Sequence, residues 1–294
     1  MPEPISIGTY TNPSSLMERL HSELRLLQQE GIPVEVDIDQ IGEFTFLDCF
    51  PRSKGVLSED DSWESIKNSV ANCLAQVIVE EWETLIIKKI VRDNYYYYNE
   101  EEKQVIFQKT KEILNPRGLN VYRQRERKEK VMERLLEYLD LNRDLILEGF
   151  VNFRLKDYQK ELENVVSAAV DEFLLEKEYA EFIRLLTYFV EIQEPRVQKV
   201  QIVFKKKGNF ALLNEHDQPL HHESLEGLMN DMLANEINFE DLLISALITL
   251  APQELLLHVE AGVKDSDAIK TIRLVFKERV TNCPGCSKCG GNKE

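Results

Sequence analysis

The sequence predicts a predominantly helical α+β protein, with a central helical bundle flanked by small mixed α/β segments at both ends. Gly and Pro interrupt helices, and residues 1–55 contain nine of them, residues 56–194 three and residues 195–294 ten. Apolar residues recur every three or four positions in the middle of the chain, whereas in both flanks they alternate with polar residues. The chain of 294 residues is long enough to bury a sizeable core.

The N-terminal segment, residues 1–55, has the pattern of a β-α-β-β module. A short apolar run precedes four leucines at helical spacing, and Gly31 follows where that helix is expected to end. Two extended runs come next, the first alternating with acidic residues and the second lying after Gly42. The residues of these patterns are Ile5 to Tyr10; Leu16, Leu20, Leu24 and Leu27; Val34, Val36 and Ile38; and Phe44 to Leu47.

Residues 56–195 form the predicted helical region, in which apolar stripes step by three and four positions. A run of four tyrosines, Tyr95 to Tyr98, interrupts the stripes, and we expect it to pack at a junction between helices. Four or five helices packed as a bundle would bury the stripes. The predicted helices run from about Trp63 toward Val91, from the tyrosines to near Pro116, from after Gly118 through Leu139, and from after Gly149 to Pro195.

The last third of the chain is predicted to be a C-terminal α+β module, residues 196–282, followed by a cysteine-rich tail, residues 283–294. Alternating apolar residues indicate a β-hairpin around a Lys-Lys-Lys-Gly-Asn turn, and later a β-α-β unit that ends at the cysteines. The expected strands are Val200 to Phe204, Phe210 to Leu213, Leu255 to Val259 and a piece near Val280; the expected helices lie at about 224–235, at 239–250 and after a cap at Asp265 or Ser266.

Composition and charge restrict the possible partners and compartment. The net charge of −16, from 52 acidic and 36 basic side chains, repels nucleic-acid phosphates and anionic lipid surfaces. The first ten residues lack the basic start and apolar core of a secretory signal, and the longest apolar stretch, Leu242 to Ala251, is too short to cross a bilayer. Five cysteines, three of them clustered, are not the dispersed set of a small secreted domain. We therefore expect a cytoplasmic protein with reduced thiols and no membrane insertion.

The sharpest chemical signal is CPGCSKCGG, in which Cys283, Cys286 and Cys289 are each three residues apart. Two residues between cysteines is the spacing of a metal-binding knuckle, because the tight turn directs the sulfurs inward and glycines let backbone N–H groups approach the thiolates. Zinc is the expected ion, and it prefers four ligands. The sequence leaves the fourth ligand open. The candidates are Cys49, Cys73, a histidine such as His258, a second subunit, or a labile water or substrate.

Three other interpretations of the cysteines stay open beside zinc binding. An iron-sulfur cluster held by three protein thiolates is a rarer arrangement. A redox-active Cys-x-x-Cys pair would use the same residues, and a flexible tail would leave the thiols without a role.

A second group of possible metal ligands lies in the loop after the predicted hairpin. None of the spacings that place two ligands on one helix face is present there, so a solvated polar loop is the favoured interpretation. The residues of this group are His216, Asp217, His221, His222 and Glu223.

A basic stretch between Arg117 and Lys130 carries a local charge of +6 − 2 = +4 in an otherwise acidic protein. Arg123, Arg125 and Arg127 are the candidate phosphate contacts in it. The favoured interpretation is instead a solvated helix face whose arginines and lysines pair with Glu126 and Glu129, so nucleic acid is not an expected partner.

Motifs that would identify a common enzyme class are missing from the sequence. It contains no phosphate-binding Gly-rich loop, G-x-S-x-G elbow, Rossmann fingerprint or EF-hand loop. This lowers the expectation of catalysis without excluding it.

Several blocks of the sequence together resemble the YtxC-like family, sporulation proteins of endospore-forming bacteria. They are FVNFRLKDY at Phe150 to Tyr158; Glu178, Tyr179, Phe182 and Ile183; Ile192 to Pro195; and the terminal cysteines. The resemblance implies the cytoplasm of a sporulating cell as the setting, and it implies no reaction or catalytic residue. It also suggests a partner surface made of Arg154, Lys156, Asp157 and Tyr158. The alternative is a helix entry in which Phe150, Phe153 and Leu155 pack into the bundle.

The preferred hypothesis is a non-enzymatic interaction or regulatory protein that carries a C-terminal thiolate metal knuckle and binds a protein partner or itself. A metal- or thiol-dependent enzyme that uses the same cysteines is the alternative. Nucleic-acid binding through residues 117–130 is the weaker alternative.

Overall fold

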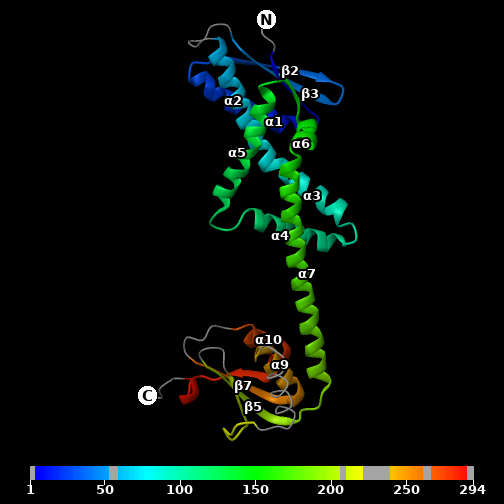
Figure 1. Ribbon diagram of the computed structural model, residues 1–294, viewed down its shortest axis with the longest axis vertical. Coiled ribbons are helices and arrows are strands. Elements are labelled where there is room, and N and C mark those ends of the chain that lie inside the picture. Colours follow the sequence, from blue (N-terminus) through cyan, green and yellow to red (C-terminus); the bar gives the residue numbers. More distant parts are fainter. Residues whose placement is uncertain (1–3, 53–58, 206–209, 221–238, 261–265, 290–294) are drawn as a thin grey trace. The chain divides into compact units, whose positions relative to one another are not determined.

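A computed structural model of the protein describes residues 4–52, 59–205, 210–220, 239–260 and 266–289 (Figure 1). The chain divides into two compact units, Met1–Leu174 and Leu175–Glu294. Most of the described elements are helices, and each unit also holds one small four-stranded sheet. The predicted fold class, a predominantly helical α+β protein, is confirmed.

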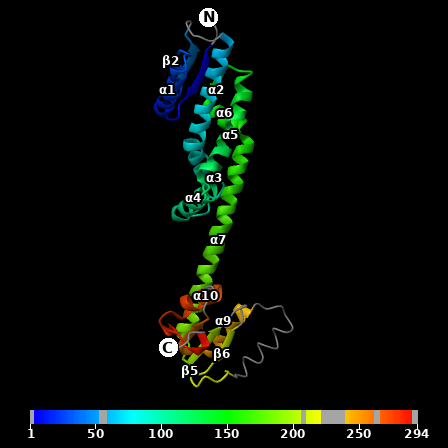
Figure 2. The same cartoon turned by 90° about the vertical axis from the view of Figure 1, so that its left-hand side faces the viewer.

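The sheet of the first unit has the strand order β2-β3-β1-β4, with β3 antiparallel to both neighbours and β4 parallel to β1. Its first three strands and helix α1 follow the predicted β-α-β-β order. The four leucines of the predicted helix stripe are the buried residues of α1, and α1 packs beside α2 (Figure 2). The elements are β1 (Ile5–Thr9), α1 (Pro13–Gln29), β2 (Val34–Ile41), β3 (Phe44–Pro51) and β4 (Asp144–Ile146).

The helices of the first unit bury most of the apolar stripes, but Phe182 and Phe189, in the part of α7 that belongs to the second unit, are about half exposed. The stripe expected from Trp63 toward Val91 is helical throughout, and it includes one π-helical segment, η1 (Ile78–Trp82). The helix expected after Gly149 begins earlier, at Leu147, and it is divided at Leu155 into two helices. The remaining bounds are α2 (Glu59–Val77), α3 (Glu83–Asn94), α4 (Glu100–Leu114), α5 (Asn120–Leu139), α6 (Leu147–Arg154) and α7 (Lys156–Ile192).

The tyrosine run forms the turn between α3 and α4. Tyr98 packs edge-on against Phe173, and Tyr95 and Tyr98 both contact the core of the first unit. Tyr96 and Tyr97 are exposed, so the packed junction that the sequence predicts is made by two of the four rings.

The sheet of the second unit has the strand order β6-β5-β7-β8, in which β5, β7 and β8 are parallel and β6 is antiparallel to β5. Helices α9, α10 and the end of α7 pack against one face of this sheet. The predicted β-α-β unit is β7-α10-β8, and the side chain of Ser266 caps α10. The elements are β5 (Val197–Phe204), β6 (Phe210–Leu213), α9 (Phe239–Leu250), β7 (Pro252–Val259), α10 (Asp267–Phe276), η2 (Lys277–Arg279), β8 (Val280–Asn282) and η3 (Ser287–Cys289).

Two expected features, the hairpin turn at 206–209 and the helix at about 224–235, lie outside the described residues. Within the described ranges, no helix combines the length and the apolar character that crossing a bilayer requires.

Candidate metal centre

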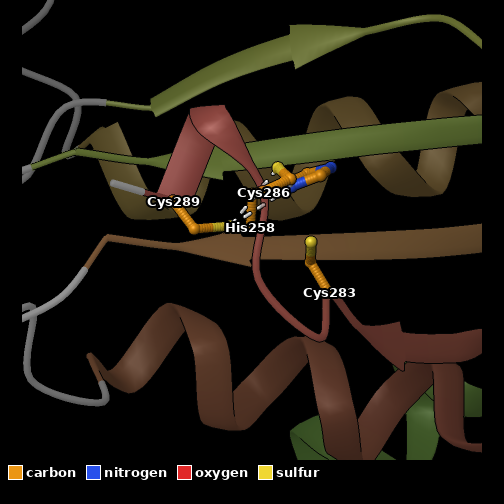
Figure 3. Close-up of side chains that lie close together, drawn as sticks. All are labelled: His258, Cys283, Cys286 and Cys289. Carbon is orange, nitrogen blue, oxygen red and sulfur yellow. Dashed lines mark hydrogen bonds between the residues drawn. The ribbon is translucent and has the colours of Figure 1, made fainter. Parts of the chain in front are cut away.

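The three clustered cysteines and His258 meet at one point in the second unit (Figure 3). The four potential donor atoms all lie within 4.8 Å of one another. His258 Nδ1 is 3.3 Å from Cys286 Sγ and 3.4 Å from Cys289 Sγ, and the two sulfurs are 3.8 Å apart. These residues could therefore hold one metal ion.

The parallel strands of the second sheet bring the four residues together. Carboxyl ends of parallel strands meet at the same sheet edge, and His258 lies near the end of β7. Strand β8 ends at Asn282, opposite Leu257, and the N–H of Cys283 then donates to the carbonyl of Leu257 over 2.9 Å. The first cysteine is thus positioned beside the histidine by the pairing of two strands.

The turns of the knuckle place the other two sulfurs. Gly285 has a φ of 123°, a backbone conformation that residues with a Cβ rarely adopt. It turns the chain between Cys283 and Cys286. A 3₁₀ turn follows, in which the N–H of Cys289 donates to the carbonyl of Cys286 over 3.0 Å. Both turns return the chain toward the same histidine.

Strand alternation puts His258 on the sheet face opposite the apolar core. Leu255 and Leu257 point into the core that the helices cover, and His258 lies on the other side together with Gln201 of β5. His258 and Gln201 are nevertheless 3% and 6% exposed. The knuckle therefore lies over the face of the sheet that the helices do not cover.

Gln201 fixes which ring nitrogen of His258 faces the sulfurs. The side-chain N–H₂ of Gln201 donates to the carbonyl of Asn214 over 2.8 Å and to Asp217 Oδ1 over 2.7 Å. Its Oε1 must then face His258 Nε2, 2.9 Å away, and accept a hydrogen bond from it. With the proton on Nε2, the lone pair of Nδ1 points at the cysteines, as in metal sites whose histidine donates its second nitrogen to an outer partner.

Lys288 places a positive charge near His258, where it contacts the outer partners of the histidine. Its Nζ donates to Gln201 Oε1 over 3.1 Å and also pairs with Asp217. Lys288 lies between Cys286 and Cys289 in the sequence, so its contacts tie the knuckle to Gln201 and Asp217.

The surroundings shift the acidity of the donors in different directions. Burial raises the pKa of the Cys289 thiol to about 11. Burial also acts to raise the pKa of Cys286, but hydrogen bonds from the backbone of Lys288 and from neighbouring cysteines outweigh it, and that pKa lies below its usual value. Burial and the charge of Lys288 lower the pKa of His258, which keeps its imidazole neutral and able to bind a metal at neutral pH.

Two of the other candidates for a fourth ligand lie in the first unit. Cys49 and Cys73 are buried in the apolar core of the first unit, where burial raises the pKa of each thiol to about 12. Of the candidates that the sequence named, the structure places His258 beside the three cysteines. Gln201 and Lys288 were not singled out from the sequence, since no spacing links them to the cysteines.

The described residues of the polar loop have two different environments: one is exposed to solvent, and the other contacts the outer partners of the metal centre. His216 is exposed and lies 3.4 Å from Glu215, whereas Asp217 contacts Gln201 and Lys288. His221, His222 and Glu223 lie outside the described residues.

The candidate phosphate contacts have different environments in the first unit. Arg127 points inward and pairs with the buried carboxylate of Glu83 over 2.6 Å, while Arg125 pairs on the surface with Glu129 over 2.8 Å. Arg123 lies at a cavity of about 600 Å³ that four glutamates also line. Arg127 lines the same cavity, but its guanidinium is used inside the fold, in the pair with Glu83.

The four residues of the candidate partner surface also have different environments, some buried and some exposed. Tyr158 is buried and donates its hydroxyl to Glu83, and both burial and that charge raise its pKa. Arg154 lies over the ring of Tyr138 at 5.6 Å, Asp157 is 3.6 Å from Arg134, and Lys156 is exposed. Phe150 and Leu155 pack into the core, whereas Phe153 is 72% exposed.

Comparison with known proteins identifies the family. The YtxC-like family matches residues 68–281, more than half of the chain, a range that includes Gln201 and His258 and ends just before Cys283. Uncharacterized protein YtxC of Bacillus subtilis (strain 168) is 32% identical over 139 residues, 47% of this chain and 48% of that protein. The chain thus spans about half the length of the curated relative that it matches. No solved structure matches it. The chain belongs to the YtxC-like family.

Proposed function

We propose that this chain is a cytoplasmic, sporulation-associated interaction or regulatory protein whose C-terminal unit is stabilised by one bound zinc ion. The observation that carries the proposal is the set of four protein donors, His258, Cys283, Cys286 and Cys289, within 4.8 Å of one another. Three cysteines and one histidine are a ligand set of structural zinc sites, which have no open coordination position.

The spacing of three of the donors fits a single tetrahedral ion, and the fourth, Cys283 Sγ, lies within 4.8 Å of each of them. With zinc–sulfur bonds of about 2.3 Å, tetrahedral geometry separates two sulfurs by about 3.8 Å and a sulfur from a nitrogen by about 3.5 Å. The Cys286 and Cys289 sulfurs are 3.8 Å apart and lie 3.3 and 3.4 Å from His258 Nδ1. An iron-sulfur cluster is less favoured, because it distributes its ligands over several irons instead of around one point.

A closed site supports a structural role over a catalytic one. A catalytic zinc keeps one position for water or substrate, and here a fourth protein donor stands where that position would be. The knuckle also covers a sheet face and encloses Gln201 and His258. The competing enzyme hypothesis requires one ligand to dissociate. It would gain support if the zinc-loaded protein hydrolysed phosphoesters, esters or peptides in a metal-dependent way.

Gln201→Leu is expected to weaken zinc binding by roughly 10- to 100-fold, the usual effect of losing an outer partner of a metal-bound histidine. Without the Oε1 acceptor, the imidazole of His258 is free to rotate and to change tautomer. Competition with a chromophoric zinc chelator measures the affinity.

Gln201→Glu combined with Asp217→Asn is the control, because the new carboxylate still accepts a hydrogen bond from His258 Nε2 and the new amide can donate to it in place of the lost acceptor pairing. It should retain most of the affinity that Gln201→Leu loses. Equal zinc affinity in the wild-type protein and Gln201→Leu would show that Gln201 does not support the metal centre.

Complementation in cells tests the biological part of the proposal. In an endospore-forming bacterium whose own family member is deleted, this chain should restore heat-resistant spores, and Cys286→Ser should restore fewer. His216→Leu, which changes an exposed histidine away from the centre, serves as the control. Normal spore counts in the deletion strain would contradict a role in sporulation, and full complementation by Cys286→Ser would separate that role from the metal.

A further inference from the structure

The second half of helix α7 exposes a row of large apolar side chains. They are Leu175 (67% exposed), Phe182 (48%), Leu185 (52%), Tyr188 (58%), Phe189 (47%) and Ile192 (58%). Single exposed apolar residues are ordinary on protein surfaces, but a group of this kind along one side of a helix marks an interaction surface.

The row follows the spacing of a coiled-coil seam. Leu175, Phe182 and Phe189 are seven residues apart, and Leu185 and Ile192 lie three residues after the second and third of them. These are the a and d positions of a heptad, which point toward a partner helix. An adjoining side of the helix is already occupied, since Ile183, Leu186 and Val190 pack into the core of the second unit.

The exposed area suits a second copy of the same surface. Six half-exposed side chains of this size leave on the order of 100 Å² each, so about 600 Å² per copy would be buried. Stable interfaces bury roughly 800 Å² per partner, and those of weak complexes fall below about 600 Å². Two copies of α7 would therefore reach the lower limit of a specific interface, which corresponds to micromolar association.

One charged residue sets the orientation of the two helices. Glu178 occupies the d position between Leu175 and Phe182. In a parallel pair, Glu178 would face its own copy, and like charges at the seam repel. In an antiparallel pair centred between Phe182 and Leu185, Leu175 faces Ile192 and Glu178 faces Phe189 of the other chain.

We propose that the protein self-associates through the heptad face of α7, Leu175 to Ile192, as an antiparallel helix pair. The proposal concerns a surface that shares no residue with the metal centre, so it stands or falls independently of zinc binding.

Sedimentation of the zinc-loaded full chain tests the association. The wild-type protein is expected to change from mostly monomer at about 1 μM to mostly dimer at about 100 μM, as a weak interface implies. Phe182→Glu with Phe189→Glu should weaken the association at least tenfold without unfolding, because both side chains are exposed. Leu141→Glu, at an apolar residue of the first unit that is 86% exposed, should have no effect.

A monomeric wild-type protein at 100 μM would overturn the proposal, and so would a double variant that dimerises as the wild type does. A photo-reactive benzoylphenylalanine at position 175, in a mixture of unlabelled and ¹⁵N-labelled chains, tests the orientation. The expected intermolecular crosslink joins it to a peptide that contains Ile192. A crosslink to the region around Leu175 of the other chain would overturn the antiparallel arrangement.

Discussion

His258→Leu is expected to lower the zinc content from about one ion per chain to a small fraction and to destabilise the C-terminal unit by about 4 kcal/mol. The first effect follows because three thiolates alone leave the tetrahedral site open. The second follows because a ligand present at about 1,000 times its dissociation constant stabilises the folded state by about 4 kcal/mol. For a unit of this size, that loss lowers the unfolding midpoint by roughly 15 °C.

The two units can be observed separately, because both tryptophans, Trp63 and Trp82, lie in the first unit. Their fluorescence should report the same unfolding midpoint of the first unit in the wild-type protein, in His258→Leu and in the wild-type protein after zinc is removed with a chelator. Hydrogen exchange at the amides of β7 and β8 should instead become faster in the latter two. His216→Leu is the control for losing a histidine outside the centre. One tightly bound zinc ion in His258→Leu would contradict the assignment of the fourth ligand.

Arg127→Met is expected to destabilise the first unit by about 3–5 kcal/mol, because it leaves the charge of Glu83 buried without its partner. The side chains of Arg127 and Glu83 are 11% and 7% exposed, and the guanidinium also donates to the carbonyl of Leu114 and to Asn115 Oδ1. Tyr158 donates its hydroxyl to the same carboxylate. The buried cluster of Arg127, Glu83 and Tyr158 therefore links α3, the end of α4, α5 and α7.

Urea unfolding followed by tryptophan fluorescence measures this cost. Arg125→Met is the matched control, since its pair with Glu129 is exposed and such surface pairs contribute little to stability. Adding Glu83→Gln to Arg127→Met removes the orphaned charge and should recover part of the loss. If Arg127→Met cost no more than Arg125→Met, the buried pair would not have the structural role assigned to it.

Local patterns predicted most elements of this fold, because helix stripes and strand alternation depend on neighbouring residues. They predicted α1 from its four leucines and the β7-α10-β8 unit from its alternation and its cap at Ser266. They did not predict β4, whose three residues are too few to show a period and which pairs with β1 about 140 positions earlier.

The metal centre was predictable only in part, for the same reason. Spacing alone, which is a local property of the sequence, predicts a metal-binding role for Cys283, Cys286 and Cys289. His258 and Gln201 join them only because β5, β7 and β8 lie side by side, and strand pairing cannot be read from one sequence. The orientation of Arg127 could not be predicted either, because the sequence of a polar helix does not show which of its charged residues faces a buried glutamate.

X-ray absorption at the zinc edge of the purified full-length protein tests the central claim most directly. We predict three sulfur neighbours at about 2.3 Å and one nitrogen at about 2.0 Å, with the outer-shell scattering of an imidazole ring. A spectrum with an oxygen neighbour in place of the imidazole, or a preparation that holds no zinc after growth in zinc-replete medium, would contradict a closed centre made by His258 and the three cysteines.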